Sequence, residues 1–376
     1  MMPVSVLFFA YACIYITFQS ILLIRLFFYY KPVAHFSKAH KPLISILIAA
    51  RNEEDNILHC LNAISKLNYP GNSIEVFIGD DQSTDNTYAL VSTYIQDKPN
   101  FTLVTIEEST TKAKGKANVL AQLAAKAKGE FLFITDADIQ VPKYWVDGLL
   151  GAFEEGTGIV SGSTVVKGKS MFACIQRVDW AYAFGMVHVV SEMNMPVTAV
   201  GNNMAIRTSC YKETGGYENL EFSVTEDLEL FIAALGKGWA FRNLLDESTT
   251  AFSAPLNSLG DVLKQRKRWL SGALRLPFLL LTFLAMQGIY FPTLVLAFVY
   301  LPWEWVLIFW LTILNLQNIF IQGVIHKIGI SHVRKDIYLF ELNRYLFPLL
   351  LFTYQLLPLG VQWKGRTYKG KEIQPR

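Results

Sequence analysis

The chain has 376 residues, of which 52% are hydrophobic and 17% are charged, and its formal net charge is +3. This composition is too apolar for an ordinary soluble enzyme, and so small a net charge implies no general binding of polyanions such as nucleic acid. The four cysteines lie far apart without a Cys-x-x-Cys pair, which argues against a zinc site and fits a reducing compartment.

The apolar residues are concentrated at the two ends of the chain. Residues 4–24 carry no charge and are long enough to span a bilayer. Arg25 and Lys31 follow directly, whereas a signal peptide carries its positive charge before the apolar run. We therefore expect an uncleaved transmembrane anchor over residues 1–30, with the chain from residue 31 onward in the cytoplasm and the protein in the inner (plasma) membrane.

Residues 31–256 have the pattern of a globular α/β domain. Apolar runs at residues 43–50, 74–78, 101–106 and 131–134 alternate with helical sequence, and the first helix is expected to open at Arg51. This alternation predicts a mostly parallel sheet with right-handed crossovers. The carboxyl ends of parallel strands meet at one edge, where open α/β sheets bind ligands. That edge is expected to collect Arg51, Glu53, Asp81, Lys116, Asp136 and Asp138.

The segment Asp136-Ala137-Asp138 places two carboxylates directly after a buried strand. Such oxygens can hold a hard divalent cation, which can neutralise a diphosphate, although the same pattern also occurs in solvated turns. Nearby, Asp81 could accept the imide N–H of a uracil and Lys116 could approach a phosphate. The chain has no P-loop and no Gly-x-Gly-x-x-Gly, which argues against a P-loop ATPase and a dinucleotide dehydrogenase.

The second half of this domain is less regular. Residues 171–193 predict one long helix whose aromatic middle, with Trp180 and Phe184, is expected in the core. Thr225-Glu226-Asp227 precedes an apolar helix, and two interpretations stay open. Either Thr225 caps the helix and the acids occupy its first turn, or Asp227 is a general base that faces the ligand edge.

The rest of the chain predicts membrane contact. Residues 257–276 form a basic, aromatic-bearing segment that is expected to be an amphipathic interfacial helix, on which Lys264, Lys267 and Arg275 only snorkel to anchor it.

Residues 277–361 are expected to supply C-terminal membrane helices. We expect two spanning helices, separated by a break around Leu301-Pro302-Trp303-Glu304. The short run at residues 345–361 is expected to be re-entrant or interfacial, so that the basic tail at residues 362–376 stays cytoplasmic.

Seven motifs stand in a fixed order over residues 47–269: Ala50-Arg51-Asn52-Glu53-Glu54, Asp80-Asp81-Gln82-Ser83-Thr84-Asp85, Lys114-Gly115-Lys116-Ala117-Asn118, Asp136-Ala137-Asp138, Gly215-Gly216-Tyr217, Thr225-Glu226-Asp227 and Gln265-Arg266-Lys267-Arg268-Trp269. Together they resemble the motifs of membrane-bound family 2 glycosyltransferases, which have an α/β GT-A catalytic domain. Each motif alone is of moderate or low specificity, and the order makes the resemblance strong.

The resemblance implies an inverting hexosyltransferase with a UDP-sugar donor and a divalent cation. The donor would be bound by Ala50, Arg51, Glu53, Asp81, Lys116 and Asp136. The metal, Mg²⁺ or Mn²⁺, would be held by Asp138 with Asp136. The catalytic set would be Glu226, Asp227, Gln265, Arg268 and Trp269. Within it Asp227 would deprotonate the acceptor hydroxyl, while Arg268 would lie near the diphosphate. One departure is Gln82, where glycine is common in the family.

The resemblance leaves the acceptor open. The Gln-x-x-Arg-Trp motif occurs in processive polysaccharide synthases and in enzymes that resemble ceramide glucosyltransferase, which add one sugar to a lipid. The few membrane segments, and the resemblance of residues 361–368 to the end of the lipid-glycosylating group, favour a lipid or lipid-linked acceptor. A catalytically silent scaffold with the same fold is a third hypothesis, against which the intact set of acidic and basic motif residues argues.

Overall fold

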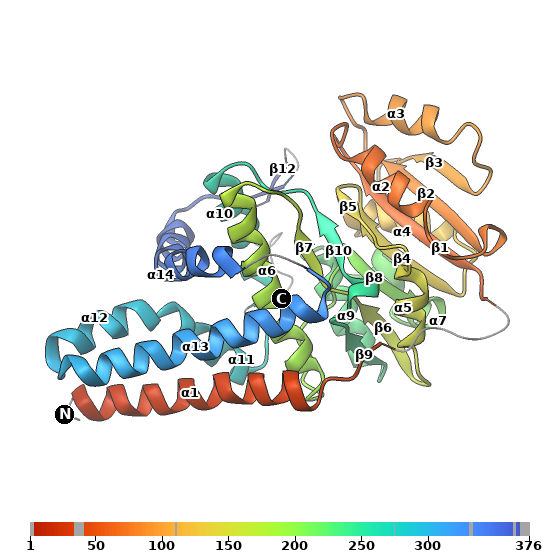
Figure 1. Ribbon diagram of the computed structural model, residues 1–376. Helices are drawn as coiled ribbons and strands as arrows, with labels where there is room; N and C mark the ends of the chain where they lie inside the picture. The colour runs from red at the N-terminus through yellow and green to blue at the C-terminus, as the bar shows by residue number, and fades with distance from the viewer. Residues whose placement is uncertain are drawn as a thin grey trace.

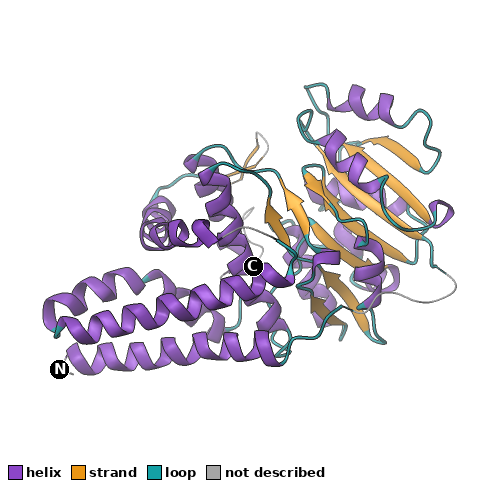
Figure 2. Ribbon diagram, in the orientation of Figure 1, coloured by secondary structure: helices purple, strands orange, loops and turns teal. Residues whose placement is uncertain are grey.

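The computed structural model describes residues 4–33, 41–109, 111–273, 275–330, 334–363 and 366–368. Its centre is a seven-stranded sheet in the order β3-β2-β1-β4-β8-β6-β9 (Figures 1 and 2). Only β8 runs antiparallel to its two neighbours, so the expected mostly parallel sheet is confirmed. The strands are β1 (Ile44–Ala50), β2 (Ile74–Asp80), β3 (Phe101–Thr105), β4 (Phe131–Asp136), β6 (Thr157–Ser161), β8 (Asn203–Arg207) and β9 (Ala240–Asn243).

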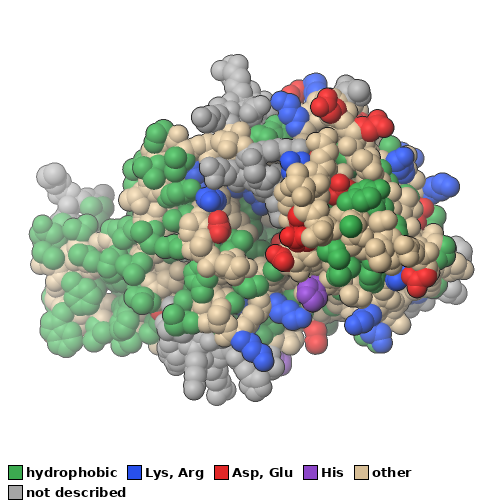
Figure 3. Space-filling view, turned by 90° about the horizontal axis from the view of Figure 1, so that it is seen from above, with side chains coloured by type: hydrophobic (Ala, Val, Ile, Leu, Met, Phe, Trp, Pro, Cys, Tyr) green, Lys and Arg blue, Asp and Glu red, His purple; other side chains and the backbone are tan. Residues whose placement is uncertain are grey.

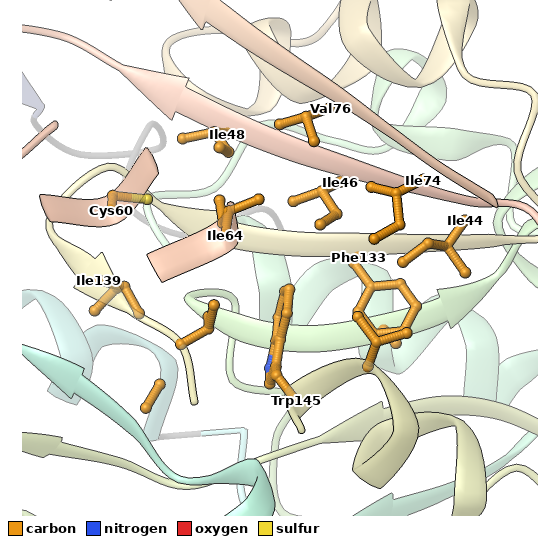
Figure 4. Close-up of a cluster of buried hydrophobic side chains, with 14 of the residues drawn as sticks. Ile44, Ile46, Ile48, Cys60, Ile64, Ile74, Val76, Phe133, Ile139 and Trp145 are labelled. Carbon is orange, nitrogen blue, oxygen red and sulfur yellow. The ribbon is translucent and has the colours of Figure 1, made fainter. Parts of the chain in front are cut away.

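Each face of the sheet buries its own apolar layer, because successive side chains of a strand point to opposite faces. On one face Ile46 packs in a cluster with Cys60 of α2 and Trp145 of α5, shown in Figure 4. On the other face Leu47 packs with residues of α4 and α9, such as Leu123 and Phe231. The helices around the sheet are α2 (Ile57–Ile64), α3 (Thr87–Tyr94), α4 (Lys116–Lys126), α5 (Trp145–Gly151), α7 (Thr208–Glu213), α8 (Gly216–Asn219) and α9 (Glu226–Gly236).

A small second sheet, in the order β5-β10-β7, lies beside the main one. It consists of β5 (Ile139–Gln140), β7 (Thr164–Val166) and β10 (Ala251–Ser253), and β5 directly follows the Asp136-Ala137-Asp138 motif. The short helices η1 (Gly71–Ser73) and η2 (Glu247–Thr249) complete the domain. Through β5, the chain passes from the carboxyl end of β4 into this second sheet.

The helices of the two chain ends form one bundle. In Figure 1, α1 (Val4–Phe28), α12 (Tyr290–Tyr300) and α13 (Trp303–Lys327) lie side by side, and Figure 3 shows hydrophobic side chains gathered over this part and charged ones over the sheet part. Among the described residues α1 and α13 are long and apolar enough to cross a membrane. A third span is possible if α11 (Phe278–Gly288) and α12, bent by 55° at Ile289, act as one. The expected break before Trp303 is confirmed.

The last apolar segment lies in helix α14 (Arg334–Leu356), which begins before residue 345. Within α14, Glu341 and Arg344 pair with each other at 2.6 Å inside the bundle. Arg344 also hydrogen-bonds Gln317 of α13. Buried charges are tolerated in a helix bundle when they pair in this way. Of the expected basic tail, only a hairpin of β11 (Val361–Trp363) and β12 (Arg366–Tyr368) lies within the described residues.

Helix α6 (Met171–Ser191) joins the two halves of the molecule (Figure 1). Its Tyr182 hydroxyl accepts hydrogen bonds from Gln19 of α1 at 3.1 Å and Gln317 of α13 at 3.2 Å. At Gly185 the helix approaches α13 so closely that a Cβ atom would lie 2.4 Å from Val324. The aromatic middle of α6 is buried, as expected, with Trp180 only 4% exposed.

We predict that Gly185→Ala destabilises the protein, because its methyl group would push α6 away from α13. An overpacked position of this kind costs about 1–3 kcal/mol of unfolding free energy. The thermal unfolding midpoint of the detergent-purified protein measures the effect. Gly236→Ala, at a helical glycine with nothing within 4 Å of the added Cβ, is the matched control. Equal midpoints for the two variants would contradict the close packing of α6 on α13.

Candidate active site

The loops after β1 and β2 interlock at the carboxyl edge of the sheet. The Asn52 N–H donates to Ser83 Oγ at 3.1 Å, and the Thr84 N–H donates back to Asn52 Oδ1 at 2.9 Å. Arg51 Nη1 donates to the Asp81 carbonyl at 2.5 Å and lies 3.5 Å from its carboxylate. The first two motifs therefore form one rigid double turn.

The backbone of this double turn explains its composition. Asn52 and Gln82 have φ of 53° and 56°, in the left-handed region where glycine and asparagine are favoured. Glycine at position 82, common in the resembling family, would meet the same requirement, and Gln82 keeps the turn. The prediction that a helix opens at Arg51 is wrong. Helix α2 begins at Ile57, because the left-handed backbone conformation of Asn52 interrupts helical geometry.

Lys116, at the start of α4, lies between two carboxylates from other elements. Its Nζ is 2.6 Å from Asp136 Oδ1 at the end of β4 and 3.1 Å from Glu226 Oε1 at the start of α9. Burial alone would lower the pKa of Lys116, but the two carboxylates outweigh this and hold the pKa above its ordinary value. The ammonium therefore stays charged and holds three elements together.

Asp227 follows Glu226 in the first turn of α9. Its Oδ2 accepts a hydrogen bond from the Gly201 N–H at 2.8 Å. Burial, and secondarily the charge of Glu226, raise the pKa of Asp227 to about 6, while Lys116, the Gly201 N–H and Arg268 oppose the shift. A carboxylate with this pKa is a competent general base near neutral pH. Thr225 stands at the N-cap and both acids lie in the first turn, as the capping interpretation expects, although the Thr225 side chain makes no capping hydrogen bond.

Helix α10 (Leu259–Ala273) carries the Gln-x-x-Arg-Trp motif across the pocket. The Trp269 ring lies 5.3 Å from the Trp180 ring of α6, and the Arg266 guanidinium lies 4.3 Å above Trp269 while pairing with Asp179. Arg268 makes no ion pair within the described part of the chain, and it lines the pocket that also contains Asp227. Its charge remains available for an anionic ligand.

One pocket of about 910 Å³ brings the predicted site residues together. All of the predicted donor, metal and catalytic residues line it: Ala50, Arg51, Glu53, Asp81, Lys116, Asp136, Asp138, Glu226, Asp227, Gln265, Arg268 and Trp269. The one motif outside its lining is Gly215-Gly216-Tyr217. The two glycines have φ of 84° and 65° and form a turn, and Tyr217 is buried in the core beneath the sheet.

The pocket continues beyond its charged end into an apolar arm. Here it is lined by α6, by the connection after α10 and by α11, through Trp180, Ala183, Phe184, Val187, Leu276 and Leu284. Sequence reasoning placed the α6 aromatics in the core and missed this second role. The signal that could have found it is the position of α6 between two segments that both carry ligand motifs.

Two basic residues of α10 and its connection are not simple membrane anchors. Lys267 is buried, and its Nζ donates to the Leu357 carbonyl at 3.0 Å, just past the end of α14. Arg275 pairs with Glu229 of α9. The expectation that both only snorkel was wrong, because carbonyl and carboxylate partners lie within their reach. Lys264 fits it better: it is more exposed and lies 3.4 Å from Asp261 of its own helix.

The carboxylates of this site suit a divalent cation only when a bound ligand supplies further oxygen atoms to the metal. Within the described ranges no group of three or more His, Cys, Asp or Glu side chains is placed to hold a metal ion. Asp136 is engaged by Lys116, and Asp138 lines the pocket beside it. Magnesium-type ions are commonly bound by one or two carboxylates together with substrate phosphates and water, and this donor set suits that mode.

The sheet topology and the carboxylate-lined pocket at its carboxyl edge agree with a GT-A fold, and the family match identifies the class as a glycosyltransferase. The model of glycosyl transferase family 21 matches residues 4–373, and the chain belongs to that family. The resemblance to membrane-bound family 2 glycosyltransferases is thereby confirmed.

Individual relatives are distant. A β-monoglucosyldiacylglycerol synthase of Nostoc sp. and a poly-β-1,6-N-acetyl-D-glucosamine synthase of Staphylococcus epidermidis are each 26% identical over 239 residues, or 61% of this chain. This match covers 49% and 54% of those proteins, so the chain spans about half the length of the curated relatives it matches. A solved mannosyltransferase of Pyrobaculum calidifontis, in complex with GDP-Man and Mn²⁺, shares the fold with TM-score 0.56 and 18% identity, covering 94% of this chain and 93% of that one.

We predict that Gly201→Ala displaces Asp227. The added Cβ would lie 2.7 Å from Asp227 Cβ and 2.8 Å from its Oδ2, so the carboxylate must move. Misplacing a reacting group by about 1 Å can cost on the order of 100-fold in rate, and we expect kcat to fall by about that factor while the Kd for nucleotide is unchanged.

Gly71→Ala, where nothing lies within 4 Å of the added atom, is the matched control and should behave as wild type. Full activity of Gly201→Ala would show that the position of Asp227 does not limit turnover.

Proposed function

We propose that this protein transfers one sugar from a UDP-sugar to a hydroxyl of a membrane lipid or lipid-linked acceptor, with inversion at the anomeric carbon. The observation that carries the proposal is the continuity of one pocket. It runs from the interlocked turns at Asp81, past Asp227 and Arg268, to Leu276 and Leu284 at the apolar helices. A polar donor and an apolar acceptor can thus meet at one carboxylate.

The donor occupies the charged end. The double turn of Arg51 and Asp81 suits the uracil and ribose, because the aspartate accepts an imide N–H and the turn is rigid. The diphosphate lies between Asp138 and Arg268. A divalent cation held by Asp138, with Asp136 close by, supplies charge neutralisation at the leaving group when bound.

The chain's own residues carry out the transfer. Asp227 takes the proton from the acceptor hydroxyl as that oxygen forms a bond to the anomeric carbon. The bond from this carbon to the diphosphate oxygen breaks in the same displacement, and the nucleoside diphosphate leaves with the bonding electron pair beside Arg268. Trp269, held by ring contact with Trp180 and by the Arg266 guanidinium, forms the wall against which the acceptor is oriented.

The lipid acceptor occupies the apolar arm. Leu284 lies on α11, the first helix of the bent pair, so this arm opens towards the part of the molecule that is apolar enough for the bilayer. The catalytic domain would then face the cytoplasm, and the protein would be a multi-pass protein of the inner membrane. The relative named as a glucosyldiacylglycerol synthase agrees with this acceptor class.

Processive polysaccharide synthesis is the second candidate. The relative named as a poly-N-acetylglucosamine synthase has the same identity and covers the same share of this chain, and the Gln-x-x-Arg-Trp motif is common to both groups. A growing polymer would need a polar path out of the pocket. The aliphatic and aromatic side chains that line the apolar arm favour an acyl chain over a glycan as its ligand.

The first prediction from this proposal concerns pH. Asp227 is active only when it is deprotonated, and its pKa is raised to about 6. The rate kcat/KM should therefore fall about tenfold per pH unit below pH 6 and level off above it.

Asp227→Asn should lose about 100- to 10,000-fold in kcat while metal-dependent UDP binding persists. Wild-type turnover of Asp227→Asn would show that Asp227 is not the base.

The second prediction concerns the apolar arm. Ala183→Trp fills the arm without touching the charged end, so it should raise the KM for a lipid acceptor at least tenfold and leave the Kd of UDP unchanged. Lipid glycosylation by the variant in mixed micelles, over a range of acceptor concentrations, measures this. Ala10→Trp adds the same bulk on an exposed position of α1 and is the control. Equal acceptor KM values for the two variants would place the lipid elsewhere.

A further inference from the structure

The C-terminal hairpin returns from the membrane bundle to the catalytic domain. Val361 pairs with Tyr368 across the antiparallel β11 and β12. Thr367 lines the main pocket, and Tyr368 lines a small adjoining cavity with Lys116, Glu226 and Arg268. A segment more than 90 residues beyond the last recognised motif thus borders the site.

The hairpin is packed against residues 222–224, the segment that leads into Asp227. The Tyr368 ring lies 5.3 Å from the Phe222 ring, and Val224, Val361 and Tyr368 are buried together in one apolar cluster. Val224 is followed by Thr225, Glu226 and Asp227 without a break. Any motion of residues 222–224 would therefore also displace the first turn of α9.

The other end of the hairpin is held by the Gln-x-x-Arg-Trp helix. Lys267, two residues after Gln265 and one before Arg268, donates from its buried Nζ to the Leu357 carbonyl at 3.0 Å and to the Tyr354 carbonyl at 3.4 Å. These carbonyls lie at the end of α14, four and seven residues before β11 begins. Lys267 therefore links the catalytic helix to the base of the hairpin.

We propose that the C-terminal hairpin is a structural wall of the active site, in which Tyr368 is a positioning residue for Asp227, and Lys267 fastens the hairpin to α10. The proposal rests on the proposed function and extends it to Lys267 and the C-terminal hairpin, to which the resemblance assigned no role in the site. Tyr368 packs on Phe222 and Val224, which holds the first turn of α9 in register with Lys116 and with the Gly201 N–H that orients the base.

The test separates positioning from binding. Tyr368→Ala and Phe222→Ala should each lower kcat about tenfold or more, with the KM for UDP-sugar and the Kd of UDP unchanged, because neither ring lines the main pocket that contains the Arg51–Asp81 double turn. The double variant should be no slower than the slower single variant, since both remove one contact. Tyr368→Phe keeps the ring and should restore most of kcat. Lys267→Met, which removes the link to Leu357, should lower kcat in the same way.

Tyr88→Ala, at an exposed tyrosine of α3 far from the hairpin in sequence, is the control and should behave as wild type. Wild-type kcat in both Tyr368→Ala and Lys267→Met overturns the proposal. So does loss of UDP binding in Tyr368→Ala, which would show that the hairpin supports the whole fold and not the base. Failure of the proposed function itself looks different: wild-type protein would release no UDP, or Asp227→Asn would turn over normally.

Discussion

The site depends on the buried ammonium of Lys116. It joins the end of β4 through Asp136 to the start of α9 through Glu226, and all three elements come from distant parts of the chain. Removing one partner from a buried pair of this kind leaves an uncompensated charge at a cost of about 3–5 kcal/mol. Around Lys116 the carboxylates of Asp136, Glu226 and Asp227 outnumber it. Burial, and secondarily the charge of Glu226, raise the pKa of Asp227. The excess of carboxylates would also favour the proposed cation beside Asp138.

Two helices connect this site to the membrane. Helix α6 contributes Trp180 and Phe184 to the pocket and is fixed to α1 and α13 through Tyr182. Helix α10 contributes Gln265, Arg268 and Trp269 and is fixed to α14 through Lys267. Because both walls of the apolar arm are held by bundle helices, the proposed lipid acceptor would be held at a fixed position relative to the bilayer. Under the proposed function, such a site glycosylates a lipid without extracting it fully.

Much of this arrangement could be predicted from the sequence. Alternating apolar runs fixed β1 to β4, and the rule that parallel strands end at one edge placed Arg51, Asp81 and Asp136 together. The parts that could not be predicted depend on tertiary contacts: the reversal of β8, the use of Lys267 as a hydrogen-bond donor to α14, and the role of the Gly201 N–H. The pairing of Glu341 with Arg344 inside α14 is likewise invisible in a hydropathy pattern.

The central claim is that the charged and apolar ends of one pocket serve one sugar transfer to a lipid. The most direct measurement incubates the detergent-purified protein with Mn²⁺, a panel of radiolabelled UDP-sugars and total membrane lipid, followed by extraction with organic solvent. The account predicts that one sugar label appears in the organic phase as a single discrete species, with release of UDP. Label found only in high-mass, solvent-insoluble material would contradict the claim and indicate a processive synthase, and absence of nucleotide release from every donor would indicate a silent scaffold.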